Sequence, residues 1–171
     1  MAVTHPQVRD PDEVLALLAR AADHIQAERL AEAASCYRQL LLEPALSDIP
    51  AARIEVLANY GALLLHEARM ADDSTVATDK LDLAIDMLSR ARAGQRLGQG
   101  GGKSMISDTN LALAYFQRHL ANGQHADLMA AHLALDGAEA DAAPDDPDLI
   151  DWIRSIRQLL LDQVDRRREL R

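Results

Sequence analysis

The sequence predicts an all-α protein, and three observations support this prediction. Hydrophobic residues make up 49% of the 171 residues but aromatic residues only 3%, so the core must be built from Leu, Ile, Val and Ala. Such a composition suits closely packed helices, whereas strands favour β-branched and aromatic side chains. Apolar residues recur every three to four positions, and no stretch alternates as a strand does. The length is that of about one domain, so we expect one helical domain over residues 11–171 behind a flexible N-terminus of residues 1–10.

The first two helices are predicted over residues 11 to about 27 and about 30 to 43. Asp10, Pro11 and Glu13 form a helix start signal, and Pro44 closes the second helix. The apolar positions are Val14, Leu17, Leu18, Ala21 and Ile25 in the first helix, and Leu30, Ala33, Ala34, Tyr37, Leu40 and Leu41 in the second.

The third helix follows Asp48 and Pro50 and has the most regular apolar spacing in the chain. After a polar loop near residues 71–75, a fourth helix is expected to end at Gly94, because glycine is the usual C-terminal cap. The apolar positions of these two helices are Ile54, Leu57, Ala58, Gly61, Leu64, Leu65 and Ala68, followed by Leu81, Ala84, Ile85, Leu88 and Ala91.

The fifth helix ends near Asn122 and Gly123, the sixth precedes Pro144, and the seventh begins with Asp146 and Pro147. Their apolar stripes are Leu111, Ala112, Tyr115 and His119 in the fifth, Leu128, Ala131, Leu135 and Ala138 in the sixth, and Ile150, Ile153, Ile156, Leu160 and Val164 in the seventh.

Charge and cysteine content narrow the possible functions. A net charge of −9 argues against a nucleic-acid binder, which needs a clustered positive surface. The C-terminal segment Arg166 to Arg171, which holds four arginines, is interpreted as placing cations at a helix C-terminus. The single Cys36 cannot form an internal disulfide and is expected to be a buried thiol rather than a nucleophile. The polar N-terminus MAVTHPQVRDPDE has no signal-peptide core or membrane span, so we expect a cytoplasmic protein without membrane contact.

The stretch GQGGGKS, Gly98 to Ser104, resembles the phosphate-binding loop of a nucleotide hydrolase. That loop needs G-x-x-x-x-G-K-[ST] between a buried strand and a helix. The position five before Gly102 is Leu97, and the preceding segment is a predicted helix. We therefore interpret the stretch as a flexible connector between helices.

No other catalytic pattern is convincing. His125 and His132 lie seven positions apart near Asp127, and His119 precedes them, but the tight spacing of zinc hydrolases is absent. The acidic run EADAAPDDPD lacks the alternating ligands of a calcium loop. The sequence therefore predicts no enzyme, no cofactor and no metal site.

Three sets of residues repeat along the chain. One set repeats in the second helix of each pair: Ala33, Tyr37, Leu40 and Pro44, then Ala84, Leu88 and Ala91, then Ala131, Leu135, Ala138 and Pro144. Another set repeats in the first helices, where Asn59-Tyr60-Gly61 matches Asn110-Leu111-Ala112. In the same helices, Leu64 matches Tyr115. This pattern resembles the tetratricopeptide repeat family, with the stretch NLALAY, Asn110 to Tyr115, as the nearest match.

The resemblance covers about residues 14–144 and implies three antiparallel helical hairpins stacked as a short superhelix. These span about residues 11–44, 50–94 and 105–144, with a capping helix at about 147–168. Because the regular unit has about 34 residues, and Ala33 and Ala84 are 51 positions apart, the resemblance also implies enlarged loops, at residues 71–79 and 95–104. The first hairpin matches poorly, and an irregular helical bundle is the alternative.

In this family the first helices line a concave groove that holds a partner. The resemblance assigns nine residues to this groove: Glu55, Asn59, Ala62, His66, Thr109, Asn110, Leu113, Phe116 and Gln117. Asn59 and Asn110 match asparagines that hold a ligand's backbone in the family, or alternatively they pin neighbouring helices. A carboxylate clamp is excluded, because its cationic positions hold Glu55, Ile106 and Asn110.

The function expected from the resemblance is a non-enzymatic adaptor or dedicated chaperone. It would bind a peptide or helix of another protein in the groove, and the acidic balance favours a basic or amphipathic segment with Leu113 and Phe116 as anchors. The alternative is a structural repeat protein that assembles into homo-oligomers.

Overall fold

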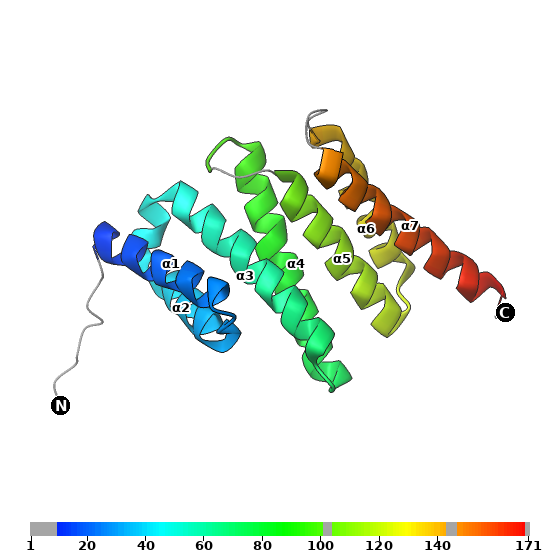
Figure 1. Cartoon of the computed structure of the whole chain (residues 1–171), viewed down its shortest axis with the longest axis horizontal. Coiled ribbons are helices and arrows are strands. Elements are labelled where there is room, and N and C mark those ends of the chain that lie inside the picture. Colours follow the sequence, from blue (N-terminus) through cyan, green and yellow to red (C-terminus); the bar gives the residue numbers. More distant parts are fainter. Residues whose placement is uncertain (1–9, 101–103, 143–146, 170–171) are drawn as a thin grey trace.

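The chain folds into α-helices arranged in the order of the sequence (Figure 1). The computed structural model describes residues 10–100, 104–142 and 147–169, with side chains as far as Arg166. The described residues form seven α-helices and one 3-10 helix and include no strand, so the predicted all-α class is confirmed. The elements are α1 (Pro11–Gln26), α2 (Leu30–Leu42), η1 (Pro44–Asp48), α3 (Pro50–Met70), α4 (Ser74–Arg96), α5 (Ser104–Asn122), α6 (His125–Asp141) and α7 (Pro147–Glu169).

Helices that follow one another pack against one another. The pairs α1 and α2, α3 and α4, and α5 and α6 each have a connection of only two or three residues. In addition, α1 contacts α3, α3 contacts α5, and α5 contacts α7. Helices α1, α3, α5 and α7 therefore form one layer, in front of α2, α4 and α6 in Figure 1.

The start of α4 lies earlier than the sequence predicted. The Asp73 carboxylate accepts hydrogen bonds from the backbone N–H groups of Thr75 at 2.7 Å and Val76 at 3.1 Å, which makes it the N-terminal cap. Only residues 71–73 separate α3 from α4. The predicted loop at residues 71–79 is therefore wrong, since its residues from 74 onward are helical.

The end of α4 lies later than predicted, and a different glycine caps it. Gly98 has a φ of 69° and donates its N–H to the Gln95 carbonyl at 3.0 Å, while Gln99 donates to the Gly94 carbonyl at 3.1 Å. This is a Schellman cap, in which glycine takes the left-handed position without strain. Gly94 lies inside the helix, where a Cβ would come within 2.5 Å of Ile54 Cδ1. The expectation that α4 ends at Gly94 was wrong because that glycine serves close packing.

Long helices, rather than enlarged loops, account for most of the spacing between the repeated residues. Helix α3 has 21 residues and α4 has 23, and η1 occupies much of the connection between α2 and α3. The second predicted loop, residues 95–104, is helical at both ends, and its residues 101–103 lie outside the described part of the chain. The flexible connector predicted at Gly98 to Ser104 shares this limit. Its residue Gly100 is described and packs close to Ile54.

The repeated small residues lie where the helices pack most closely. Ala33, Ala84 and Ala131 are all completely buried, and so are Leu88 and Leu135. Because these residues occupy matching places in α2, α4 and α6, the three helices bury the same face of the repeated pattern.

A buried carboxylate ties α4 to α5. Asp108 on α5 is fully buried and pairs with Arg92 and Arg96 of α4, and Arg96 also lies 3.7 Å from Asp141 of α6. Burial raises the pKa of the Asp108 carboxyl group, and the two guanidinium groups oppose that rise. Gly137 leaves room for this cluster, because a Cβ there would lie 2.8 Å from Arg96 Nη2.

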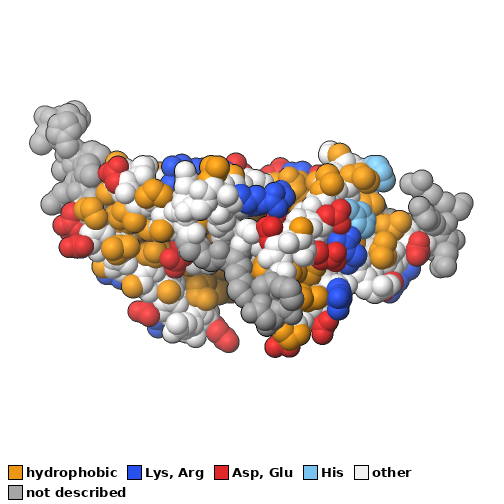
Figure 2. Space-filling view, turned by 90° about the horizontal axis from the view of Figure 1, so that it is seen from above, with side chains coloured by type: hydrophobic (Ala, Val, Ile, Leu, Met, Phe, Trp, Pro, Cys, Tyr) orange, Lys and Arg blue, Asp and Glu red, His pale blue; other side chains and the backbone are white. Residues whose placement is uncertain are grey.

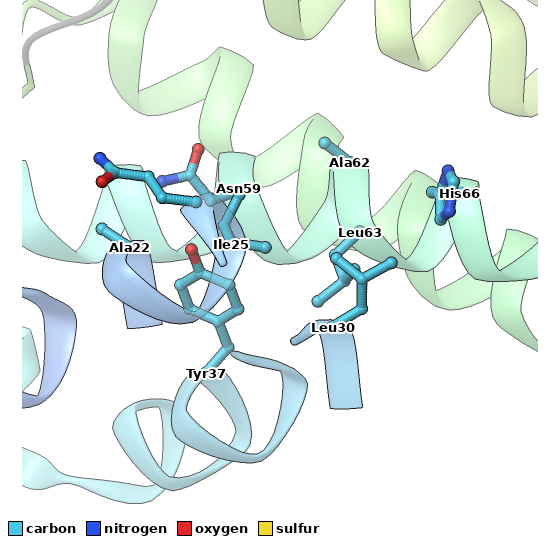
Figure 3. Close-up of a pocket in the computed structure, with 9 residues that line it drawn as sticks. Ala22, Ile25, Leu30, Tyr37, Asn59, Ala62, Leu63 and His66 are labelled. Carbon is cyan, nitrogen blue, oxygen red and sulfur yellow. The ribbon is translucent and has the colours of Figure 1, made fainter. Parts of the chain in front are cut away.

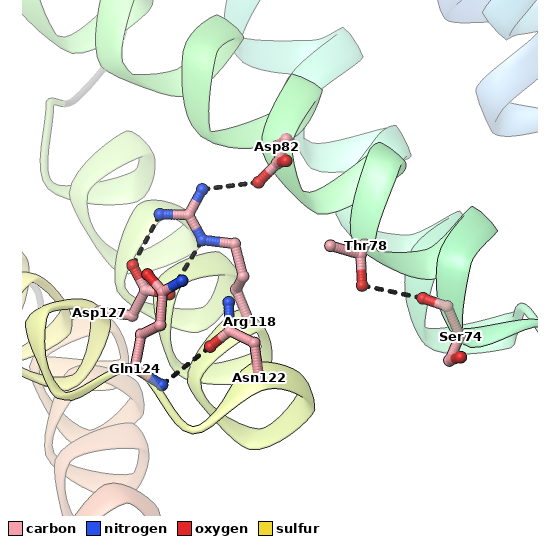
Figure 4. A network of polar contacts seen from close by, with 7 residues as sticks. All are labelled: Ser74, Thr78, Asp82, Arg118, Asn122, Gln124 and Asp127. Atoms are coloured by element: carbon pink, nitrogen blue, oxygen red, sulfur yellow. Dashed lines mark hydrogen bonds and ion pairs between the residues drawn. The ribbon is translucent and has the colours of Figure 1, made fainter.

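A second cluster joins three helices through Arg118 of α5 (Figure 4). Its guanidinium donates two hydrogen bonds to Asp127 of α6, from Nε at 3.0 Å and Nη2 at 2.6 Å, and a third to Asp82 of α4 at 2.6 Å. These bonds raise the pKa of Arg118 above its ordinary value. The same guanidinium lies 5.5 Å from the centre of the Tyr115 ring. Arg118 therefore connects the α3–α4 pair to the α5–α6 pair.

The end of α1 supplies a first testable prediction. Glu28 has a φ of 55° in a Schellman cap closed by Arg29, which donates to the His24 carbonyl at 2.8 Å. A left-handed residue other than glycine is strained by about 1 kcal/mol, so Glu28→Gly is expected to raise the free energy of unfolding by up to that amount. Urea denaturation measures it, with Ala19→Gly on the exposed face of α1 as the control that should lose about 1 kcal/mol. Destabilisation by both variants would contradict this account of the cap.

Candidate functional site

The front layer of helices carries two adjoining pockets, and the first lies between α1, α2 and α3 (Figure 3). Its volume is about 410 Å³. We call it the α1–α3 pocket, and its lining residues are Ala22, Ile25, Gln26, Leu30, Tyr37, Asn59, Ala62, Leu63 and His66. Most of these side chains are apolar, with a few polar groups among them, a combination that is typical of binding pockets.

The polar floor of the α1–α3 pocket is a contact between two helices. Tyr37 of α2 is buried, with its hydroxyl pointing toward Asn59 of α3 (Figure 3). Burial raises the pKa of the Tyr37 hydroxyl, and the charge of Glu55 raises it further. The Tyr37 and Tyr60 rings lie 6.0 Å apart, centre to centre. Of the two roles considered for Asn59, this contact corresponds to the pinning of neighbouring helices.

The second pocket lies between α3, α5 and α7 and has a volume of about 420 Å³. We call it the α3–α7 groove, and its lining residues are Ala62, Leu65, His66, Arg69, Asn110, Leu113, Phe116, Gln117, Leu120, Trp152, Ile156, Leu159 and Gln163. Ala62 and His66 line both pockets. The two hollows are therefore neighbours along one surface of the front layer.

The lining of both pockets is apolar and contains no carboxylate. Leucine side chains that remain 40% and 44% exposed, Leu120 and Leu159, lie along the α3–α7 groove. Among the described residues that line the two pockets, Arg69 is the one with a permanent charge, and the other polar ones are His66, neutral amides and Tyr37. The acidic residues behind the net charge of −9 thus supply no described lining residue, although the charge of Glu55 reaches Tyr37 in the α1–α3 pocket.

The structure brings most of the predicted groove residues to this surface. Those that line one or both pockets are Asn59, Ala62, His66, Asn110, Leu113, Phe116 and Gln117. Glu55 is exposed on α3 and lines neither pocket. Thr109 is completely buried, and its hydroxyl donates to the Met105 carbonyl at 2.7 Å. Thr109 is therefore removed from the set that a partner could reach.

Sequence reasoning missed the contribution of α7. Trp152, Ile156 and Leu159 supply one wall of the α3–α7 groove, although α7 was predicted only as a cap. Their spacing of four and then three positions could have indicated this wall, because it widens the apolar stripe of α7 toward a second face of that helix. The opposite wall of the α1–α3 pocket, from α1 and α2, was missed for a different reason: the first pair matched the repeat poorly.

Two of the residues considered for metal binding, His119 and Asp127, have other partners. The Nδ1 atom of His119 lies 2.7 Å from the Gln124 carbonyl oxygen, and Asp127 is bound by Arg118. Within the described ranges, no three His, Cys, Asp or Glu side chains lie close enough together to hold an ion. Cys36 is a free, buried thiol, as expected. Residues 143–146 of the acidic run and most of the basic C-terminal segment lie outside the described side chains.

Among the helices described, none combines the length and apolar character that crossing a membrane requires. Searches of protein-family models, curated proteins and solved structures returned no match to this chain.

Proposed function

We propose that this chain is a non-enzymatic interaction module, an adaptor or dedicated chaperone, which binds an amphipathic segment of another protein in the α3–α7 groove. The observation that carries the proposal is the groove itself, an open and mostly apolar surface built by α3, α5 and α7, in which α5 contacts both other helices. Exposed apolar surface of this kind, flanked by polar residues, marks interaction sites in other proteins. Trp152 supplies aromatic surface of the kind that dominates binding energy at interfaces. Phe116, which was expected to be an anchor for the partner, is only 4% exposed and belongs to the hydrophobic core behind the groove.

A tetratricopeptide-like architecture supports this proposal. Three antiparallel hairpins and a capping helix would place α1, α3, α5 and α7 on the inner side of a short superhelix, which agrees with the contacts between these helices. Buried Ala33, Ala84 and Ala131 in matching places support the same arrangement. In such repeats the inner layer is the surface that binds partners.

A photocrosslinking experiment tests the proposed function. A photoreactive amino acid replaces Leu113 in the groove, or Leu133 on α6, which is 65% exposed and lines neither pocket. We expect a discrete crosslinked partner in the protein's own cells from position 113 and none from position 133. Adding Ala62→Arg, which places a long cation in the groove, should remove the crosslink while the circular dichroism spectrum stays helical. The same partner at both positions, or a crosslink that survives Ala62→Arg, would contradict the assignment.

Self-assembly is the second candidate, and exposed leucines near the N-terminal end favour it. Leu42 is 83% exposed and Leu15 is 46% exposed. On the face shown in Figure 2, hydrophobic side chains gather toward that end, while acidic and basic ones mix toward the C-terminal half. Light scattering over a hundredfold concentration range separates the two candidates. A mass that stays monomeric rules out self-assembly, and a concentration-dependent oligomer that Leu42→Glu dissolves supports it.

A further inference from the structure

We infer that the segment bound in the α3–α7 groove is acidic, and that one of its carboxylates pairs with Arg69. This inference rests on the proposed function, because it specifies the chemistry of the partner at the same site. It reverses the expectation from net charge, which favoured a basic partner.

The first argument concerns the ion pairing of Arg69. Arginines at the helix interfaces have carboxylate partners within the chain, as Arg118 has in Asp127 and Arg157 has in Glu139. Arg69 is exposed and lines the groove, and over the described residues it has no ion-pair partner. Its guanidinium, which forms bidentate pairs with carboxylates, is therefore available to an incoming group.

The second argument is the absence of carboxylates from the lining. The chain holds 27 Asp and Glu residues, yet none of those whose side chains are described lines the α1–α3 pocket or the α3–α7 groove. A lysine of a bound segment would lose water there without gaining a counter-charge, which costs free energy. The negative charges elsewhere act at a distance and are screened beyond about 8 Å at physiological salt. At contact distance, the charge of Arg69 determines the preference.

The position of Arg69 also places the acidic group along the segment. Arg69 lies in the last turn of α3, and it lines a further surface pocket together with Leu120 of α5. The apolar wall of the groove, with Leu113 and Leu159, continues from that end. An amphipathic segment would therefore lay its apolar side on this wall and present a carboxylate where α3 ends.

A structural role for Arg69 competes with this inference. A cation in the last turn of a helix interacts favourably with the helix dipole, and this needs no partner. Such a role would change stability when Arg69 is replaced, but it would not change which peptide binds. The test therefore measures the preference between two peptides rather than one affinity.

The test uses two labelled 18-residue peptides that share one leucine-rich face and carry either Glu or Lys on the other. Fluorescence anisotropy gives both dissociation constants for the wild-type chain, for Arg69→Glu and for Arg20→Glu. Arg20 is an exposed cation on α1 outside the two pockets, so both variants change the net charge equally. We expect Arg69→Glu to shift the ratio of the constants toward the Lys peptide by about threefold to tenfold more than Arg20→Glu does.

Each result leads to one conclusion. Equal shifts in the two variants, or a wild-type preference for the Lys peptide that Arg69→Glu leaves unchanged, overturn the inference. In those cases the proposed function still stands if Leu113→Asp weakens both peptides. If neither peptide binds the wild-type chain, or if Leu113→Asp has no effect on either, the groove assignment itself is contradicted.

Discussion

Replacing Arg118 with alanine is expected to lower the free energy of unfolding by about 3 kcal/mol, because it leaves the buried carboxylate of Asp127 without its partner. The Asp127 side chain is only 5% exposed and receives two of the three hydrogen bonds from the guanidinium (Figure 4). The position of Asp127 in the first turn of α6 offsets part of the loss, since the helix dipole favours an anion there. The change also removes the contact between Arg118 and the Tyr115 ring.

The same network contains a matched control. Asp82 accepts the third hydrogen bond from Arg118 but is 57% exposed, so its charge stays solvated when the pair is broken. Asp82→Asn should therefore cost no more than about 1 kcal/mol. Thermal unfolding followed by circular dichroism separates the two, because 3 kcal/mol corresponds to roughly 6–12 °C in a chain of this size. Equal losses from Arg118→Ala and Asp82→Asn would show that burial of Asp127 does not govern the energetics.

Patterns with a helical period predicted the fold well, because each helix buries one stripe. Helix ends, which depend on capping residues, were predicted correctly in some places and wrongly in others. Asp10 and Gly123 serve as caps as expected, since Asp10 accepts from the Glu13 N–H and Gly123 has a φ of 73°. Gly94 and Gly98 could not be told apart in the sequence, because one glycine is needed for packing against Ile54 and the other for its backbone angle.

The part of the candidate site that lies on a single helix face was predicted from the sequence. The part that depends on how several helices pack together was missed. The face of α3 that carries Ala62 and His66 follows from helical spacing alone, and both residues line the pockets. Thr109 shares the corresponding region of α5 but is buried, because α5 has neighbours on more sides than its own periodicity reveals. The α7 wall with Trp152 depends on how the last helix docks, which no local pattern specifies.

The second large effect is expected at Gly61 of α3. Among the described glycines, it is the one at which an added Cβ would lie against the backbone of a neighbouring helix, α4. A Cβ at this position would lie 2.7 Å from Leu88 Cγ and 3.3 Å from the Leu88 backbone nitrogen. The side chain cannot move far, because Leu88 is completely buried, and the backbone atom moves only with the helix. Gly61→Val is therefore expected to cost about 3 kcal/mol, at the upper end of the range for overpacking.

A smaller variant and a double variant keep this prediction testable even if Gly61→Val does not fold. Gly61→Ala adds one methyl group but gains about 1 kcal/mol of helix propensity, so we expect a net loss of about 1 kcal/mol. Leu88→Ala removes the obstructing side chain and by itself should cost about 2–5 kcal/mol. Combined with Leu88→Ala, the Gly61→Ala change should become neutral or stabilising, because the new methyl group fills part of the cavity. Urea denaturation of the four proteins gives the coupling energy directly.

The outcome at Gly61 bears on the repeat as well as on packing. Ala112 holds the matching place in α5, so one methyl group is already present between the next pair of helices. If Gly61→Ala proved harmless in the wild-type background, the two pairs would have interchangeable spacing and the close approach of α3 to α4 would not be required. Ala93→Val, on the exposed side of α4, measures the cost of a β-branched residue in a helix, expected to be below about 1 kcal/mol. A loss at position 61 that exceeds this control identifies the glycine as the residue that sets the distance between α3 and α4.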